Sequence, residues 1–465
     1  MTLIKSISGI RGTIGGKSGE ALTPLDIVKF TAAFVELIRK ERTKDKLVMV
    51  VGRDARLSGF MVNQLVCGSL QAMGVNVIDI GQSTTPTVEV AVPALNADGG
   101  IILTASHNPA QWNALKLLNH KGEFISAAEG EWLLEKAEQE GFVFSSIEMI
   151  GSYEKQEGWI EKHIQMVCDL ALVDKEAIKN ASFSVAVDAV NSTGGLAIPA
   201  LLQALGVEVI FPLYCEPNGD FPHNPEPLAE HLTTIASLVK EQKASLGFVV
   251  DPDVDRLAIV DENGKMFGEE YTLVAVADYV LQQQGGSTVS NLSSSRALRD
   301  VTRSHGCQYQ ASAVGEVNVV ELMKQTNAII GGEGNGGVIY PELHYGRDAL
   351  VGVALFLTHL AKSGKSCSEL RASYPDYHMS KNKLQLDAKT DVDALLKRLA
   401  GHYSDEEIST IDGLKIDFEH GWVHLRKSNT EPIIRIYSEA KTPEQAKALA
   451  HRMIDIAQQM IAGMA

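Results

Sequence analysis

The sequence of 465 residues predicts an α/β protein, with three related, doubly wound mixed-sheet α/β domains and a C-terminal α+β domain arranged around a central cleft. Two patterns predict this fold. Short apolar, β-branched runs alternate with amphipathic stretches from about residue 47 to residue 360, as in parallel or mixed sheets covered by helices. Beyond residue 374 the chain shows a helix, short strands and a long terminal helix instead. We place the domains at residues 1–150, 151–255, 256–372 and 373–465.

The first domain contains short apolar runs at residues 47–51 and 75–80, which are typical of buried strands. Residues 59–73 between them have helical spacing. A further apolar run at residues 100–104 ends just before Ser106. We therefore expect this serine in a loop at the end of a strand.

The later domains repeat this alternation. In the second, we expect strands at 184–187, 207–211 and 245–250 and a helix at 228–240. In the third, we expect a helix at 271–281, a strand at 286–292, a helix before Gly306 and a strand at 328–330. In the last, we expect a helix at 392–399, three short strands and a helix from Pro443 to about residue 461.

Composition excludes several classes of partner. The formal charge of -16 and the pI near 5.3 argue against nucleic acid or an anionic membrane surface, because long-range repulsion would slow either encounter. The five cysteines are scattered and include no CxxC pair, which is typical of idle thiols in a reducing cytosol. No stretch approaches 18 uninterrupted apolar residues, and the N-terminus lacks an apolar signal region. We expect a soluble, cytoplasmic protein.

Three aspartates, Asp251, Asp253 and Asp255, alternate directly after a predicted buried strand. A looped backbone can turn these carboxylates toward one point, and Mg²⁺ prefers carboxylates plus a substrate phosphate. An EF-hand would place Glu262 at position 12 of its loop, but Arg256 stands where that loop needs glycine and predicted strands flank both ends. A solvated acidic turn is the other alternative. The pattern favours a single Mg²⁺ site.

The segment Ser106-His107-Asn108-Pro109 places a hydroxyl between an apolar strand and a proline that fixes the backbone. A serine held in this way can be phosphorylated and act as a covalent relay, although an ordinary turn has the same pattern. Mg²⁺ would neutralise a phosphoserine, which favours contact between Ser106 and the aspartates. Lys116 is either a general acid or base whose pKa burial lowers, or a solvated lysine on a strand.

Two further loops have the chemistry of sugar and phosphate binding. Glycines around Glu333 and Asn335 let the backbone approach a ligand, while the carboxylate and the amide can each bind a hydroxyl. Near the C-terminus, Arg426 can pair with a phosphate, with small donors beside it at Ser428, Asn429 and Thr430. Turns without a ligand are the alternative in both places. If all four loops face one ligand, the domains must surround a cleft.

Together these segments resemble the alpha-D-phosphohexomutases, a family that includes phosphoglucosamine mutase and the phosphomannomutase/phosphoglucomutase enzymes. The likeness spans nearly the whole chain. Gly9-Ile10-Arg11-Gly12 is similar to the family's N-terminal loop, residues 104–109 to its phosphoserine loop, 251–256 to its metal loop, 332–336 to its sugar loop and 426–432 to its phosphate loop.

The resemblance implies that Ser106 is phosphorylated in the resting enzyme and that its phosphate joins the three aspartates around Mg²⁺. Such enzymes transfer that phosphate to a hexose monophosphate, giving a 1,6-bisphosphate that also serves as activator. The bisphosphate turns around and returns its other phosphate, so phosphate moves between O6 and O1. The implied catalytic residues besides Ser106 are Arg11 and Lys116 for proton transfer, Arg256 for stabilising the transferring group, and His107. The implied binding residues are Glu333 and Asn335 for the sugar, and Arg426, Ser428, Asn429 and Thr430 for the distal phosphate.

Several positions depart from the commoner pattern of the family. Asn335 stands where serine is frequent, Gly337 where histidine is frequent, and Ala114 in place of a glycine, while residues 313–316 lack a basic residue. These changes concern the sugar rather than the phosphoryl transfer. The opening at residues 9–12 favours phosphoglucosamine mutase, with phosphomannomutase/phosphoglucomutase as the alternative. A non-catalytic sugar-phosphate sensor and a phosphatase are hypotheses outside the class. We expect a hexose phosphate as partner, neither nucleic acid nor membrane, and a monomer or homodimer.

Overall fold

The computed structural model describes residues 2–6, 9–387, 390–428 and 432–462. The chain forms two compact units, of which the first comprises Met1–Gln283 and Asn335–Arg371 and the second Gln284–Gly334 and Ala372–Ala465. Within the described ranges, no helix is both long enough and apolar enough to cross a lipid bilayer.

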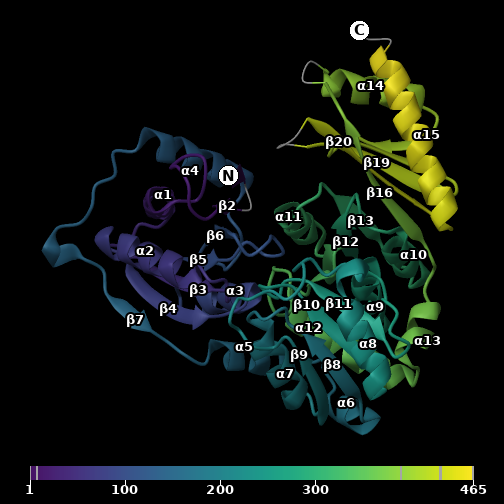
Figure 1. The fold of residues 1–465 in the computed structure, drawn as a ribbon, viewed down its shortest axis with the longest axis horizontal. Helices are drawn as coiled ribbons and strands as arrows, with labels where there is room; N and C mark the ends of the chain where they lie inside the picture. Colours follow the sequence, from purple (N-terminus) through teal and green to yellow (C-terminus); the bar gives the residue numbers. More distant parts are fainter. Residues whose placement is uncertain (1, 7–8, 388–389, 429–431, 463–465) are drawn as a thin grey trace. The chain divides into compact units, whose positions relative to one another are not determined.

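A seven-stranded mixed sheet opens the first unit, with strand order β1-β2-β6-β5-β3-β4-β7 (Figure 1). Its strands are β1 (Leu3–Ser6), β2 (Gly9–Thr13), β3 (Val48–Arg53), β4 (Asn76–Gln82), β5 (Gly99–Leu103), β6 (Trp112–Leu118) and β7 (Tyr153–Lys155). The helices are α1 (Pro24–Glu41), α2 (Gly59–Ala72), α3 (Thr85–Ala94) and α4 (Ala127–Gln139), with a 3₁₀ turn η1 (Ile147–Met149).

Helices cover both faces of this sheet. Met49 and Val51 of β3 pack into the core formed with α1 and α2, whereas Val50 packs into the separate core formed with α3. Successive side chains of a strand point to opposite faces, so a strand buried on both sides needs a continuous apolar run. This requirement explains the apolar runs seen in the sequence.

A four-stranded sheet follows, with order β11-β10-β8-β9. Its strands are β8 (Ser184–Asp188), β9 (Val209–Leu213), β10 (Leu246–Val250) and β11 (Leu257–Asp261). The remaining elements of this unit are α5 (Trp159–Cys168), α6 (Lys175–Ala181), α7 (Gly194–Ala204), η2 (Ala229–His231), α8 (Thr233–Gln242), α9 (Glu269–Gln283), β15 (Gly337–Ile339), α12 (Ala349–Ser363) and α13 (Cys367–Ala372). Because β11 is antiparallel to β10 and pairs Leu257 with Val250, the chain reverses within residues 251–256.

The second unit contains a parallel set of strands and an antiparallel sheet. Strand β12 (Thr288–Asn291) lies parallel to both β13 (Tyr309–Ser312) and β14 (Ile330–Glu333), with helices α10 (Arg296–Ser304) and α11 (Glu316–Thr326). The C-terminal sheet has order β16-β20-β19-β18-β17 and all its pairs are antiparallel. It comprises β16 (His378–Gln385), β17 (Glu407–Ser409), β18 (Leu414–Phe418), β19 (Gly421–Lys427) and β20 (Ile433–Ala440), with helices α14 (Val392–His402) and α15 (Pro443–Ala462), the latter lying along the sheet (Figure 1).

The predicted α/β class with a C-terminal α+β domain is confirmed, but four local predictions are wrong. The last sheet has five strands rather than three, because β16 carries mostly polar, half-exposed residues and lacks an apolar alternation. The helix predicted at 228–240 begins only at Thr233, since a 3₁₀ turn precedes it. The strand predicted at 207–211 lies at Val209–Leu213, and the strand predicted at 328–330 lies at Ile330–Glu333. The arrangement around a central cleft stays a prediction.

Candidate active site

Ser106 lies in the loop after β5 and is only 3% exposed. Its amide donates to Thr104 Oγ1 at 2.9 Å, and its φ of +49° is uncommon for a residue other than glycine. Such a conformation persists only where the surrounding contacts impose it. The hydroxyl is therefore held in one place.

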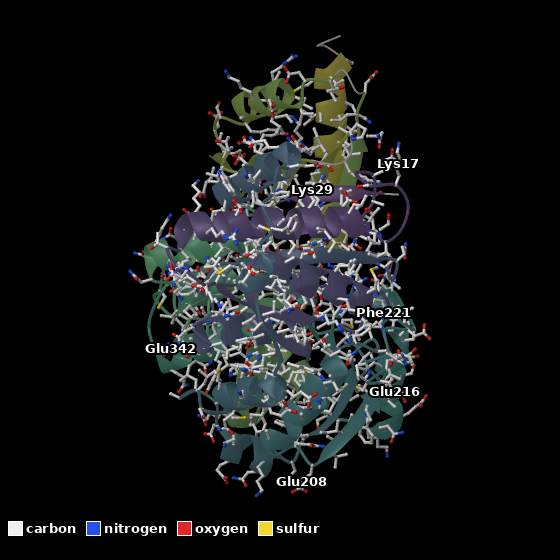
Figure 2. All side chains as sticks on the ribbon, turned by 90° about the vertical axis from the view of Figure 1, so that its left-hand side faces the viewer. Lys17, Lys29, Glu208, Glu216, Phe221 and Glu342 are labelled. Carbon is white, nitrogen blue, oxygen red and sulfur yellow. The ribbon has the colours of Figure 1, made fainter. Side chains whose placement is uncertain are left out.

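A buried guanidinium supplies much of that support. Arg56, on the loop after β3, donates to the carbonyl oxygens of Ser106, Asn108 (2.7 Å), Pro109 (2.8 Å) and Trp112 (3.0 Å). It also pairs with Asp54 at 2.9 Å, and both side chains are fully buried. The ring of Phe221, labelled in Figure 2, lies 5.2 Å from the guanidinium carbon. One side chain thus fixes four carbonyl groups of the serine loop.

The three aspartates occupy the loop between β10 and β11 and are fully buried. One carboxylate oxygen of each lies within 4.8 Å of the others. Val254 between them has φ of +65°, which is strained for a β-branched residue. Glu262 is bound instead by Ser368, whose amide donates to it at 3.1 Å, so the EF-hand alternative fails.

Ser106 and the aspartates meet within the first unit although 145 residues separate Ser106 from Asp251. Ser106 Oγ donates to Asp251 Oδ2 at 2.7 Å. The structure therefore brings together the hydroxyl and the acidic triad, as the sequence predicts.

The electrostatics of the triad suit a divalent cation. Burial, followed by the charges of Asp255 and Asp253, raises the pKa of Asp251 well above its usual range. Oδ1 of Asp253 and Oδ1 of Asp255 are buried without a hydrogen-bond partner. Buried acceptors of this kind are costly unless a cation or donor binds them. The residues present therefore fit a hard metal ion bound by oxygen ligands.

Lys116 lies in this cluster but differs from the sequence expectation. Its ammonium is 2.6 Å from Asp253 Oδ2 and 3.3 Å from Asp255 Oδ2. Burial alone would lower its pKa, as predicted from the sequence, but the two carboxylates outweigh burial and raise the pKa. Lys116 is therefore a cation in this site, which corrects the expectation of a lowered pKa.

Three other predicted residues surround the serine. Arg11 of β2 donates to Asn108 Oδ1 at 2.7 Å, and burial lowers its pKa. His107 Nδ1 lies 3.2 Å from Ser106 Oγ, and burial, together with Arg256 and Arg11, lowers the pKa of His107 to about 2. The imidazole is therefore neutral. The amide of Arg256 donates to Asp251 Oδ1 at 3.2 Å, while its buried Nε makes no hydrogen bond.

The predicted sugar loop is tied to the aspartate loop at one end. Gly336 accepts a hydrogen bond from the amide of Leu257 at 3.1 Å, and Asn335 Oδ1 accepts one from Gly337 at 3.2 Å. At Gly336, φ is +86° and a Cβ atom would lie 2.3 Å from the carbonyl oxygen of Leu257. Only glycine fits there.

The other predicted binding residues belong to the second unit. Glu333 ends β14 and its Oε1 accepts from Asn291 Nδ2 at 2.9 Å and from the amide of Gly315 at 3.2 Å. Arg426 Nε donates to Asp412 Oδ2 at 2.7 Å. The amide of Ser428 donates to the carbonyl of Ile433 at 3.1 Å, while Asn429 and Thr430 lie outside the described residues.

Sequence reasoning missed three side chains that support the site. Arg56 holds the serine loop, as described above. Thr85 Oγ1 donates to Asp253 Oδ2 at 2.6 Å, and Arg347 donates to Asp255 Oδ2 at 2.8 Å. Each lies far in sequence from the residue it contacts. The one local pattern that could have indicated Arg56 is the pair of charged residues Asp54 and Arg56 at the end of an apolar strand.

Comparison with known proteins extends these observations. Family models described as phosphoglucomutase/phosphomannomutase match the chain in order, with α/β/α domains I, II and III at residues 3–144, 161–264 and 268–377 and the C-terminal domain at residues 382–456. The chain is 37% identical over 458 residues to a phosphoglucomutase/phosphomannomutase of Thermococcus kodakarensis, covering 97% of this chain and 99% of the relative.

Two further proteins agree. A phosphoglucosamine/phosphogalactosamine mutase of Sulfurisphaera tokodaii is 32% identical over 459 residues, covering 96% of this chain and 97% of that protein. The crystal structure of a phosphoglucomutase/phosphomannomutase family protein from Burkholderia thailandensis superposes with a TM-score of 0.84 at 27% identity, covering 98% of this chain and 97% of that one. The chain therefore belongs to the phosphoglucomutase/phosphomannomutase family, within the alpha-D-phosphohexomutase superfamily.

Proposed function

We propose that this chain interconverts hexose 6-phosphate and hexose 1-phosphate through a phosphoserine at Ser106 and a hexose 1,6-bisphosphate intermediate. One observation carries the proposal: Ser106 Oγ donates at 2.7 Å to a carboxylate of a fully buried aspartate triad. A phosphate on that hydroxyl would lie beside a cation held by the same carboxylates. Membership of the phosphohexomutase family supports an isomerase of this kind.

Asp251, Asp253 and Asp255 would hold one Mg²⁺ ion, since their oxygens are hard ligands and two of them have no hydrogen-bond partner. Bound there, Mg²⁺ would neutralise charge on the phosphate oxygens. The buried Nε of Arg256, which makes no hydrogen bond, would bind a peripheral oxygen of the transferring group. Arg11, which donates to Asn108 of the serine loop and whose pKa burial lowers, would assist proton transfer.

During transfer, the bond between phosphorus and Ser106 Oγ breaks as a bond forms to the free sugar hydroxyl, whose proton would replace the one that Lys116 gives to the serine oxygen. Lys116 is charged, so it would donate a proton to the leaving serine oxygen and accept one in the reverse transfer. His107 is neutral and would orient the serine oxygen from 3.2 Å. Asn335 and Glu333 would bind sugar hydroxyls, and Arg426 with Ser428, Asn429 and Thr430 the distal phosphate, whichever end of the intermediate faces them.

For the sugar, we propose glucosamine phosphate as the preferred substrate. The relative from Sulfurisphaera tokodaii, named for glucosamine and galactosamine phosphates, supports this choice. The second candidate is mannose or glucose phosphate, which the 37% identity to the Thermococcus kodakarensis relative favours. The two candidates share the phosphoryl chemistry and differ only in the groups that contact the sugar ring.

A substrate panel tests both levels of this proposal. The protein is incubated with Mg²⁺, a trace of hexose 1,6-bisphosphate as activator, and glucosamine, mannose or glucose 6-phosphate, and ³¹P NMR follows the appearance of hexose 1-phosphate. We expect turnover, fastest with glucosamine 6-phosphate, and its loss in Ser106→Ala. Ser69→Ala is the matched control, because Ser69 is also buried but donates only to a helix carbonyl of α2. If no sugar is isomerised, the mutase proposal is wrong.

The same experiment separates the other hypotheses. A sensor would bind the sugar phosphate without converting it and would never carry a phosphate on Ser106. A phosphatase would release inorganic phosphate in proportion to the substrate consumed. The five cysteines are all unpaired, which fits the proposed cytoplasmic location. Sedimentation would decide between the proposed monomer and homodimer.

A further inference from the structure

A second cluster of metal-binding side chains lies in the first unit, apart from the aspartate triad. It consists of His163 on α5 and of His344 and Asp348 on the segment between β15 and α12. His163 Nε2 lies 3.0 Å, and His344 Nε2 3.3 Å, from the same atom, Asp348 Oδ2. His163 and Asp348 are fully buried, and the side chain of His344 is 10% exposed. Two imidazoles thus converge on one carboxylate oxygen.

The atoms of the three side chains that face away from this centre each lie beside another polar group. His163 Nδ1 lies 2.9 Å from Thr87 Oγ1. Asp348 Oδ1 accepts a hydrogen bond from the amide of Leu350 at 2.8 Å, at the start of α12. His344 Nδ1 lies 3.4 Å from Glu89 Oε2. Metal-binding histidines commonly present one nitrogen to the metal while a hydroxyl or carboxylate orients the other.

A metal ion can take the place of the protons between the imidazoles and the carboxylate. An imidazole that carries its proton on Nδ1 presents a lone pair at Nε2. In that tautomer the Nε2 atoms of His163 and His344 and Asp348 Oδ2 offer three ligand atoms to one cation. His344 Nδ1 is buried and makes no hydrogen bond, although Glu89 Oε2 lies 3.4 Å away. A metal ion at Nε2 would strengthen donation from Nδ1 to that carboxylate.

The spacing of these atoms agrees with a metal site. In a tetrahedral site with metal–ligand bonds of about 2.0–2.1 Å, neighbouring ligand atoms are about 3.3 Å apart. The two distances to Asp348 Oδ2, 3.0 Å and 3.3 Å, are close to that edge length. We propose that His163 Nε2, His344 Nε2 and Asp348 Oδ2 form a second metal site, for a divalent transition ion of the Zn²⁺ class.

This site and the aspartate triad differ in ligand chemistry. Imidazole favours Zn²⁺ and its transition-metal neighbours, whereas an all-oxygen set favours Mg²⁺. The two sites can therefore be loaded independently, and the second survives an excess of Mg²⁺.

The role of the second site is structural. The amide and the hydroxyl of Thr85, which begins α3, donate to Asp253 at 2.9 Å and 2.6 Å. The amide of Ala349, next to Asp348, donates to the carbonyl of Val254 at 3.2 Å. A metal ion that joins His163 to the segment leading into α12 would therefore stabilise the aspartate loop. This inference goes beyond the proposed mutase activity and does not depend on it.

Metal titration of the full-length protein tests it. The chelator-treated protein, kept in excess Mg²⁺, is titrated with Zn²⁺ against a fluorescent chelator and with Co²⁺ by visible absorption. We expect one Zn²⁺ per chain, the strong visible absorption of four-coordinate Co²⁺, and a higher unfolding temperature with Zn²⁺. His163→Gln and His344→Gln should each weaken binding by at least about 100-fold, and Thr87→Val, which removes only an orienting hydroxyl, by about 10- to 100-fold.

Two controls locate the ion. His359→Gln removes a buried histidine that lies 3.4 Å from Asp278 and belongs to neither metal-binding group of the described residues, and it should leave binding unchanged. Asp253→Asn should also leave Zn²⁺ binding unchanged, because it alters only the triad. Absence of Zn²⁺ binding in the wild type would overturn the proposal. Binding as tight as that of the wild type in both histidine variants, or loss of binding in Asp253→Asn alone, would also overturn it. If a histidine variant does not fold, ¹¹³Cd NMR of the wild type decides, since a shift typical of all-oxygen coordination contradicts the site.

Discussion

Replacing Arg56 with Met should loosen the serine loop without touching Ser106 itself. The fully buried guanidinium pairs with Asp54 and donates to four loop carbonyls. Removing one partner of a buried ion pair costs about 3–5 kcal/mol, because a buried charge is left uncompensated. We take about 4 kcal/mol as the loss in local opening free energy, which corresponds to roughly a 1000-fold faster amide exchange.

Hydrogen–deuterium exchange of peptides covering residues 104–113 measures this effect directly. Arg53→Met is the matched control. Arg53 ends β3, the strand before the Arg56 loop, but it is half-exposed and donates to a single carbonyl, that of Asp54. Adding Asp54→Asn to Arg56→Met removes the uncompensated carboxylate, so global stability should recover in part while the loop still exchanges quickly. Exchange of this loop within threefold of the wild type in a folded Arg56→Met protein would refute the reasoning.

Three other substitutions test further parts of the account. Gly336→Ala should lower the free energy of unfolding by about 2 kcal/mol or more in urea titrations and should slow turnover. The reason is that alanine is strained at φ +86° and its Cβ would lie 2.3 Å from a carbonyl oxygen. Gly364→Ala, at φ +65° with open space around it, should lower the free energy of unfolding by less. Lys116→Met should lower the unfolding temperature most without divalent ions, since it removes the ammonium that pairs with Asp253, and a loss independent of Mg²⁺ would contradict this. His424→Gln should reduce the loss of unfolding free energy at acidic pH. Burial lowers the pKa of His424 from 6.5 to about 4, so the unfolded chain binds a proton that the folded chain does not, and up to about 3 kcal/mol of stability is lost as pH falls from 6.5 toward 4. An unchanged profile in the variant would exclude His424 as the cause.

Much of the chemistry was visible in the sequence because it is local. The three aspartates alternate within five residues, so their convergence needs only one loop after a buried strand. Ser106 is likewise marked by the apolar run before it and the proline after it. The contact between the two loops was predicted from charge neutralisation rather than from any sequence pattern, and the structure places their atoms 2.7 Å apart.

The remaining features depend on tertiary contacts that no local pattern reports. Arg56 and Arg347 reach the site across 50 and 92 residues, respectively. The pKa of Lys116 depends on a balance between its burial and two carboxylates that are distant in sequence, and the sequence reveals neither the burial nor the contact. The strand β16 escaped prediction for a different reason, because a half-exposed strand need not have an apolar alternation.

Quenched-flow mass spectrometry of the Ser106 peptide tests the central claim most directly. The protein is first phosphorylated with hexose 1,6-bisphosphate and then mixed with a hexose 6-phosphate. The account predicts that the peptide loses about 80 Da, the mass of a phosphoryl group, at a rate at least as fast as turnover, and regains it in the steady state. Turnover with the phosphoryl group on another residue, or undiminished turnover in Ser106→Ala, would contradict this claim.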